Sequence, residues 1–425
     1  MTIITSPPKP KQQQIDDPQV LFREARQRRR RRRLAAGTVT VAVAAVLIVW
    51  LVSLTGARTL VRRPPSVQHP TTPIRPVGGA TVIPQVSWVD NYGQLHIGDI
   101  SGFSQRVVAQ ADADPTAPLV SVAGRVFWVR SQQQVPDQPV TPIPNPKVIG
   151  FDVATGQTNQ IASGTQVFAS VDRTFIYVET DRRHLAEYWP DGTRKGRTLR
   201  LPDGWFLLNP SGNSNPTPAI ANGILVVSTA FPHSTYAGED GTLAIWNPTT
   251  GNVRSLGKAW EVSATYTAPG ARSSLIAWYP ANCGSSNNCT LKITNTANYS
   301  SRIVTSPIRH FLWGGAFSPD GRQLAVFVHS HYMQGNPTAQ LTMIDTRSGS
   351  LTLVSGVHVY VGDSVHWAQW LPDGNHVITG GLGGPFGSSY PAVDVLVDSQ
   401  TLQVSPFRFI ADRNQDLTIS TVLVQ

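Results

Sequence analysis

Histidine is the side chain in this sequence best suited to metal binding or acid–base chemistry. Six of the ten histidines lie between residues 310 and 376, namely His310, His329, His331, His358, His366 and His376. His329 and His331 are two residues apart, so on a β-strand both rings would point to the same side, and His366 could approach from the next repeat. His329, His331 and His366 are therefore a candidate metal site, because zinc is held by three or four converging ligands. The alternatives are hydrogen bonding to a ligand, pH sensing and plain loop positions.

The two cysteines, Cys283 and Cys289, occur together in C-G-S-S-N-N-C. Two thiols do not complete a zinc site, and this spacing matches no common one. Outside the cytosol a disulfide closing this polar loop is the better interpretation. The chain-entropy model gives so short a loop about 2 kcal/mol of stabilisation.

Motifs of the common catalytic classes are missing from the sequence. No G-x-S-x-G nucleophile elbow is present, and the glycine-rich run at 380–387 lacks the lysine of a phosphate loop. We therefore expect no cofactor, and we favour a non-enzymatic protein.

Positive charge is concentrated at the N-terminus. Residues 1–33 hold ten Lys and Arg against three acidic residues, so +7 of the net charge of +9 lies there, including the run Arg28, Arg29, Arg30, Arg31, Arg32 and Arg33. The rest of the chain carries only +2, which argues against nucleic-acid binding.

An uncharged apolar segment follows the arginines, at Leu34–Ala57. Its 24 residues would form a helix about 36 Å long, enough to cross a hydrocarbon core of about 30 Å. Arginines beside a span stay in the cytoplasm, so we predict a single-pass plasma-membrane protein with a cytoplasmic N-terminus and an extracytoplasmic C-terminal domain. A cleaved signal peptide is the alternative, and the arginines could also bind anionic lipid.

The chain is thus predicted to have four parts. Residues 1–33 form a basic tail, 34–57 a transmembrane helix, 58–81 a proline-rich linker, and 82–425 an extracytoplasmic domain.

A repeat with a period near 50 residues runs through this last part. An apolar strand ends in Asp or Asn, and a turn leads to the next strand, at Asp99, Asp152, Asp191, Asn247, Asn295, Asp345 and Asp398. Fifty residues is the length of a four-stranded propeller blade, so the seven repeats predict a seven-bladed, all-β propeller.

Residues Ser318–Phe327 (S-P-D-G-R-Q-L-A-V-F) resemble the repeat of TolB-type and related WD-repeat-like β-propellers. The resemblance implies a propeller and carries over no functional residue. Pro-Asp-Gly is a typical turn sequence, and it is predicted between first and second strands at Pro319–Gly321 and Pro372–Gly374. At Pro190–Gly192 it is predicted between third and fourth strands.

The first repeat has only three strands, whereas Leu417–Gln425 is one strand too many for the seventh. We expect this C-terminal strand to lie innermost in the first blade and to close the propeller.

Five long insertions are predicted between second and third strands, on one face of the propeller, at 131–146, 231–241, 280–289, 330–337 and 382–391. Long loops on a rigid scaffold commonly bind ligands. We therefore expect a non-enzymatic protein that displays a propeller for a protein, peptide or glycan of the cell envelope. A metal-dependent propeller lyase or hydrolase and a structural subunit of an envelope complex are the alternatives.

Overall fold

The computed structural model describes part of the 425-residue chain, namely residues 85–89, 93–99, 105–113, 118–133, 141–208, 217–228, 241–284, 290–305, 310–311, 315–329, 338–360, 367–380, 394–407 and 421–424. The chain divides into two units, residues 1–73 and 74–425, and every described residue belongs to the second. The predicted tail, transmembrane helix and linker lie outside the described residues. Within the described ranges there is no helix with the length and hydropathy of a membrane span.

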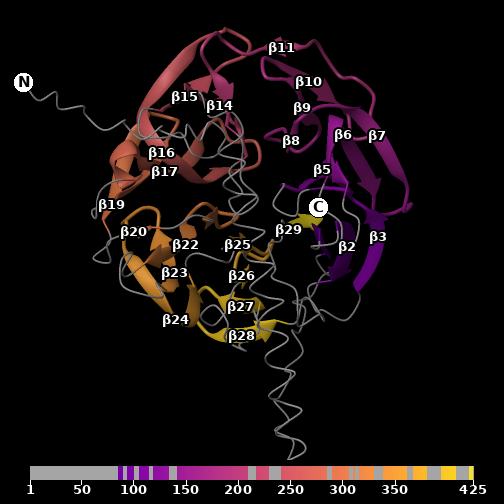
Figure 1. The fold of residues 1–425 in the computed structure, drawn as a ribbon. Coiled ribbons are helices and arrows are strands. Elements are labelled where there is room, and N and C mark those ends of the chain that lie inside the picture. Colours follow the sequence, from indigo (N-terminus) through magenta and orange to yellow (C-terminus); the bar gives the residue numbers. More distant parts are fainter. Residues whose placement is uncertain are drawn as a thin grey trace, which may run out of the picture. The chain divides into compact units, whose positions relative to one another are not determined.

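The described part of the second unit is all-β, as predicted, with one short 3-10 helix at Ala281–Gly284 (η1). Its strands pair antiparallel in sheets that follow one another along the chain (Figure 1).

The first sheet joins the two ends of this unit. Its strand order is β29 (Thr421–Val424), β1 (Gln85–Val89), β2 (Gln94–Asp99) and β3 (Gln105–Gln110). β29 pairs antiparallel with β1, from Gln85 opposite Val424 to Trp88 opposite Thr421. The predicted pairing of the last strand with the first sheet is therefore confirmed.

The next two sheets are simple four-stranded meanders. One contains β4 (Val120–Val122), β5 (Arg125–Gln133), β6 (Thr141–Asp152) and β7 (Thr158–Ser163). The other contains β8 (Gln166–Ala169), β9 (Ile176–Asp181), β10 (His184–Tyr188) and β11 (Leu199–Arg200).

A long strand joins the following two groups of strands into one eight-stranded sheet. The members are β12 (Phe206–Leu207), β13 (Ala219–Ile220), β14 (Gly223–Val227), β15 (Thr242–Trp246), β16 (Val253–Thr267), β17 (Ser274–Pro280), β18 (Thr290–Asn295) and β19 (Ser300–Thr305). The first part of β16, up to Lys258, pairs with β15, and the part from Ala259 onward pairs with β17.

Two further sheets complete the unit. One contains β20 (His310–Phe311), β21 (Ala316–Phe317), β22 (Gln323–His329), β23 (Thr338–Asp345) and β24 (Leu351–Tyr360). The other contains β25 (Trp367–Trp370), β26 (His376–Gly380), β27 (Asp394–Asp398) and β28 (Val404–Phe407).

The core lies between sheets that are consecutive in the chain. On β22, Leu324 and Val326 pack in a cluster with β17 and β18, whereas Ala325 and Phe327 pack in a cluster with β25 and β26. Both faces of such a strand are buried, which is why its sequence is apolar throughout rather than alternating with polar residues. The result is a propeller-like succession of sheets stacked face to face.

The repeated Asp or Asn makes a turn between third and fourth strands. The Oδ1 atom of Asp152 accepts hydrogen bonds from the backbone N–H groups of Ala154 and Thr155, both at 3.0 Å. Asn247, Asp345 and Asp398 accept equivalent bonds from the residues two and three positions later. The sequence repeat is therefore a repeat of Asx-turns.

The Pro-Asp-Gly triplets take the predicted places. Pro319–Gly321 lies between β21 and β22, Pro372–Gly374 between β25 and β26, and Pro190–Gly192 between β10 and β11. Gly321 and Gly374 have φ of 70° and 68°, which a residue with a side chain adopts only under strain.

One predicted insertion is partly wrong. Residues 131–146 were expected to form a loop, but β5 continues to Gln133 and β6 begins at Thr141. β5 pairs with Thr141 and Pro142 and again with Lys147–Asp152, whereas residues 143–146 lie at a register shift between these two stretches. Pro144 and Pro146 fall in this irregular stretch, where the ladder needs no N–H group from them.

Candidate functional site

The insertion face is the set of sheet ends at which second strands connect to third strands and one sheet connects to the next. All five predicted insertions lie between second and third strands, after β5, β14, β17, β22 and β26. Because neighbouring strands are antiparallel, these connections and the links between sheets share one end of each sheet. Most residues of the insertions themselves lie outside the described ranges.

Three buried carboxyl groups lie at this same end. Asp112, Glu179 and Glu261 are the buried acidic side chains of the described residues, at 5%, 3% and 3% exposure. Asp112 is in the link between β3 and β4, Glu179 is near the end of β9, and Glu261 is near the start of the part of β16 that pairs with β17. Burying a carboxyl group costs stability unless it is protonated or paired, so each requires a local explanation.

Asp112 is paired with an arginine. Its Oδ2 atom lies 2.5 Å from the Nη2 atom of Arg130, whose side chain is half exposed at the end of β5. The Nε2 atom of Gln110 donates a weaker bond to Oδ1 at 3.3 Å. This carboxylate is therefore neutralised within the protein.

Glu179 is held by a hydroxyl group instead of a cation. The Oγ1 atom of Thr165 donates a hydrogen bond to Glu179 Oε2 at 2.8 Å. The pKa of Glu179 is raised to about 7, chiefly by burial and to a smaller extent by the charge of Asp181, against the lowering effects of the Thr165 bond and the charge of Arg182. The group therefore changes its charge near neutral pH.

Glu261 lies in a buried polar pair of residues. It is directly opposite Tyr279 in the β16–β17 register. Burial, with a further contribution from the Glu261 charge, raises the pKa of Tyr279 far above its usual value, so the phenol is a neutral hydrogen-bonding group.

Sequence reasoning missed these three carboxyl groups. The pattern that could have revealed two of them is a single Glu inside an apolar strand, in I-Y-V-E-T and W-E-V-S-A. Such a residue is rarely buried without a partner.

The candidate metal ligands are only partly described. His329 is the last residue of β22, and the backbone of His310 on β20 lies directly opposite it. His331 and His366 lie outside the described residues, so the proposed set of three is untested. Within the described ranges, no group of three or more His, Cys, Asp or Glu side chains is placed to hold a metal.

His376 has a local role in a turn. Its Nδ1 atom lies 2.6 Å from Asp373 Oδ2, in the Pro-Asp-Gly turn that precedes β26.

The predicted disulfide falls partly outside the described residues. Cys283 is half-buried in η1 and packs against the cluster that contains Tyr279 and Leu291. Cys289 lies in the undescribed segment 285–289. The pairing of these two cysteines remains a prediction.

Buried tryptophans on the strands pack between sheets. Trp128, Trp278 and Trp370 are each at most 5% exposed. Their indole N–H groups donate 2.8 Å hydrogen bonds to Ala111 O, Thr294 Oγ1 and Ala316 O respectively.

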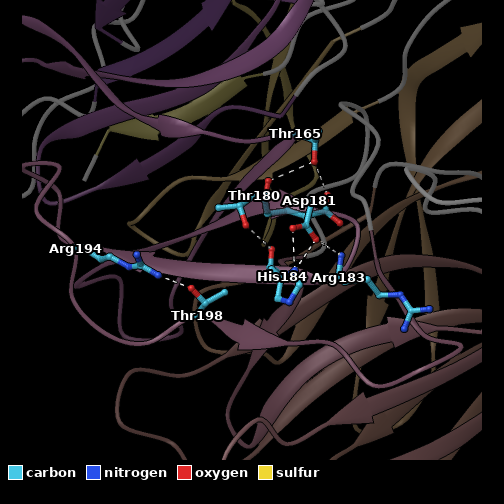
Figure 2. A network of polar contacts seen from close by, with 8 residues as sticks. Thr165, Thr180, Asp181, Arg183, His184, Arg194 and Thr198 are labelled. Atoms are coloured by element: carbon cyan, nitrogen blue, oxygen red, sulfur yellow. Dashed lines mark hydrogen bonds and ion pairs between the residues drawn. The ribbon is translucent and has the colours of Figure 1, made fainter.

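A cavity of about 430 Å³ lies beside the outer strand of the β8–β11 sheet. It is lined by Arg197, Thr198, Leu199, Arg200, Leu201, Pro202 and Asp203, and by Trp246, Pro248 and Gly251 from β15 and the turn that follows it. Figure 2 shows polar contacts of this region, including the bond from Arg194 to Thr198. The volume is that of a small-molecule site, and nothing in the sequence patterns indicated it.

Comparison with known proteins gives structural resemblance only. No protein-family model matches the chain, and no curated protein matches it. Solved structures with a similar fold include oligogalacturonate lyase from Vibrio parahaemolyticus, at 10% identity and a TM-score of 0.47, covering 76% of this chain and 85% of the lyase. A protein from Lactobacillus plantarum has 10% identity and a TM-score of 0.47, and the match covers 80% of this chain and 100% of that protein.

A protein assigned as TolB from Agrobacterium tumefaciens has 12% identity and a TM-score of 0.37, covering 61% of this chain and 87% of that protein. The TolB and lyase structures are β-propellers with different roles. Resemblance at this level assigns no function to this chain, which is similar to propeller proteins of both binding and enzymatic kinds.

Proposed function

We propose that this chain is a single-pass membrane protein that displays a seven-bladed β-propeller as a binding domain outside the cytoplasm. Counting the two parts of β16 as strands of separate blades divides the eight-stranded sheet into two. The described strands then form seven units, each with four strand positions, and β29 supplies the missing strand of the first.

The observation that carries the binding proposal is the common position of the insertions. Each lies between the second and third strands of a different unit, so the repeated strand order brings them to one face. The ligand we propose for this face is a protein, peptide or glycan of the cell envelope.

Membrane attachment is proposed from the N-terminal sequence. The uncharged run Leu34–Ala57 is long enough to cross a bilayer, and Arg28–Arg33 hold its N-terminal end in the cytoplasm. The Pro-rich residues 58–81 would then separate the propeller from the membrane surface.

Photocrosslinking from matched positions on the two faces tests the binding proposal. Arg182 is exposed in the turn between β9 and β10 on the insertion face, and Arg347 is exposed in an Asx-turn on the opposite face. A photoreactive residue in place of Arg182, in the full chain in intact cells, should capture an envelope component, whereas one in place of Arg347 should not. Equal capture from both positions, or from neither, would contradict a ligand on the insertion face.

Protease treatment tests the orientation separately. Protease added outside cells whose envelope has been made permeable to it should remove the propeller and leave the basic tail intact. If the propeller survives until the cytoplasmic membrane is lysed, the proposed orientation is wrong.

A further inference from the structure

We propose that the cavity beside β11 is a binding site for a phosphate monoester group, separate from the insertion face. Its apolar base and its charged rim come from different residues. Leu199, Leu201 and Trp246 are buried and belong to one hydrophobic cluster shared by the β8–β11 sheet and the sheet that follows it. Arg197 and Arg200 are exposed and supply cations to the lining.

Positive charge exceeds negative charge around the cavity. The acidic side chain of the lining, Asp203, is bonded through Oδ1 to Arg183 at 2.6 Å and to Arg200 at 3.3 Å. Arg194 donates to the hydroxyl group of Thr198. The lining therefore holds two guanidinium groups and one carboxylate, and just outside it lie Arg183 and Arg194 together with Glu187, which lies against Gly196.

Arg197 has no partner among the described residues, neither an ion pair nor a hydrogen bond. A guanidinium group presents donors in a planar fork that matches phosphate oxygens. With Asp203 already bonded twice, the cations left over favour a doubly charged group rather than a single carboxylate.

Trp246 provides a second, independent observation. The other buried strand tryptophans Trp128, Trp278 and Trp370 each donate their indole N–H to the protein. Trp246 is only 3% exposed and lines the cavity, yet its N–H has no acceptor among the described residues. The Trp246 Nε1 atom is not among the enclosed polar atoms of the described residues that lack a partner, so its N–H is open to solvent and can donate to a ligand oxygen in the cavity, as we infer that it does.

Calorimetric titration of the full chain in neutral detergent at low salt tests this inference. The probes are inorganic phosphate, glucose 6-phosphate and a short-chain phosphatidic acid, with glucuronate as the carboxylate comparator. Saturable binding of a phosphate compound, tighter than that of glucuronate, is expected. The tighter of the two esters identifies a soluble or a lipid source of the group.

Variants connect the binding to the cavity. Arg197→Gln and Trp246→Phe should each weaken phosphate binding about tenfold. Arg197→Gln should leave the melting temperature close to that of the parent, because its guanidinium group has no partner among the described residues, whereas Trp246→Phe removes part of a buried ring from a hydrophobic cluster and should lower it. Arg347→Gln removes an exposed cation from another sheet and should bind phosphate as the parent does. The proposal is overturned if the parent shows no saturable binding at about 10 mM, if glucuronate binds more tightly, or if neither cavity variant binds more weakly than Arg347→Gln.

Discussion

Thr165 Oγ1 donates a hydrogen bond of 2.8 Å to Glu179 Oε2, although the carboxyl group of Glu179 is only 3% exposed. The bond joins the residue just before β8 to the end of the neighbouring strand β9. A hydroxyl donor compensates a buried carboxylate less well than an arginine does, which is consistent with a raised pKa at this position.

Glu179 should therefore make stability fall as the pH rises. Its pKa is about 7 in the folded protein against 4.5 as the ordinary value, so the folded state binds the proton more tightly. The stabilisation is complete below about pH 4.5 and is lost as the pH passes through about 7. Between these limits the free energy of unfolding should fall by up to about 3 kcal/mol.

Urea titrations at a series of pH values measure this dependence. Glu179→Gln should reduce its slope above pH 5 and should be more stable than the parent at pH 8. Glu187→Gln, a change on the next strand, is the control and should keep the parental slope. If the free energy of unfolding of Glu179→Gln changes with pH as steeply as that of the parent, the pH dependence comes from other groups.

Asp345 should make stability rise as the pH rises, which is the opposite of the effect of Glu179. It accepts backbone bonds from Ser348 at 2.6 Å and Arg347 at 3.0 Å, and these bonds, with that from Ser348 first, lower its pKa below 3.8. The stabilisation is present above the unfolded pKa and is lost as the pH falls through the folded one.

Substitution at Asp345 separates the turn from the charge. Asp345→Ala should lose about 1 kcal/mol at pH 7 because the Asx-turn acceptor is removed. Asp345→Asn should lose less than this, since Asn247 makes the same turn with an amide oxygen and only the charge-dependent part is removed. Thermal melts of both variants measure the difference, and equal losses would show that the charge matters and the turn does not.

Gly321 and Gly374 form a matched pair for a packing prediction. Both have positive φ in Pro-Asp-Gly turns, but an added Cβ at Gly321 would collide with the ring of Tyr266, whereas the space at Gly374 is open. Tyr266 is itself held by a 2.6 Å bond from its hydroxyl group to Pro319 O.

Gly374→Ala should thus cost about 1 kcal/mol, the strain of a left-handed residue. Gly321→Ala should cost about 2–3 kcal/mol because the clash is added. Denaturation of the two variants side by side gives the difference directly. Equal costs would mean that the tyrosine moves away freely.

Removing the closing strand should destabilise the whole domain. Deleting residues 417–425 removes the partner of β1 and exposes its edge. Loss of about four ladder hydrogen bonds, at about 1 kcal/mol each, should lower the melting temperature by roughly 10 °C or abolish cooperative unfolding. Deleting Gln425 alone is the control, and an unchanged melt in the longer deletion would show that β29 does not close the domain.

The disulfide predicted from sequence can be tested by mass spectrometry of unreduced peptides. A linked Cys283–Cys289 peptide is expected, and its reduction should lower stability by about 2 kcal/mol. Free thiols on both residues in protein from an oxidising compartment would disprove the pairing.

Much of the fold could be predicted because its signal is local. An Asx-turn needs one Asp or Asn at the end of a strand, and this residue recurs at Asp152, Asn247, Asp345 and Asp398 with a spacing set by the size of one sheet. The pairing of the C-terminal strand with β1 followed from counting strands, which needs no knowledge of packing.

The sites were hidden because they depend on contacts between distant segments. The cavity combines residues around Arg200 with Trp246, which belongs to another sheet, and no short pattern records that neighbourhood. The raised pKa of Glu179 depends mainly on its burial, which is a property of the folded sheet and not of the local sequence. Likewise, the proline-rich start of β6 was expected to be a loop, because its pairing with β5 on both sides of an irregular stretch is a property of two distant segments.

The continuity of β16 has a mechanical consequence for the domain. One strand supplies hydrogen bonds to β15 through its first part and to β17 through its second, with Gly257 at a φ of 130° and a register shift at Ala259/Glu261 where the partner changes. A pull on either group of strands therefore reaches the other through this backbone and its ladder hydrogen bonds, without passing through a loop.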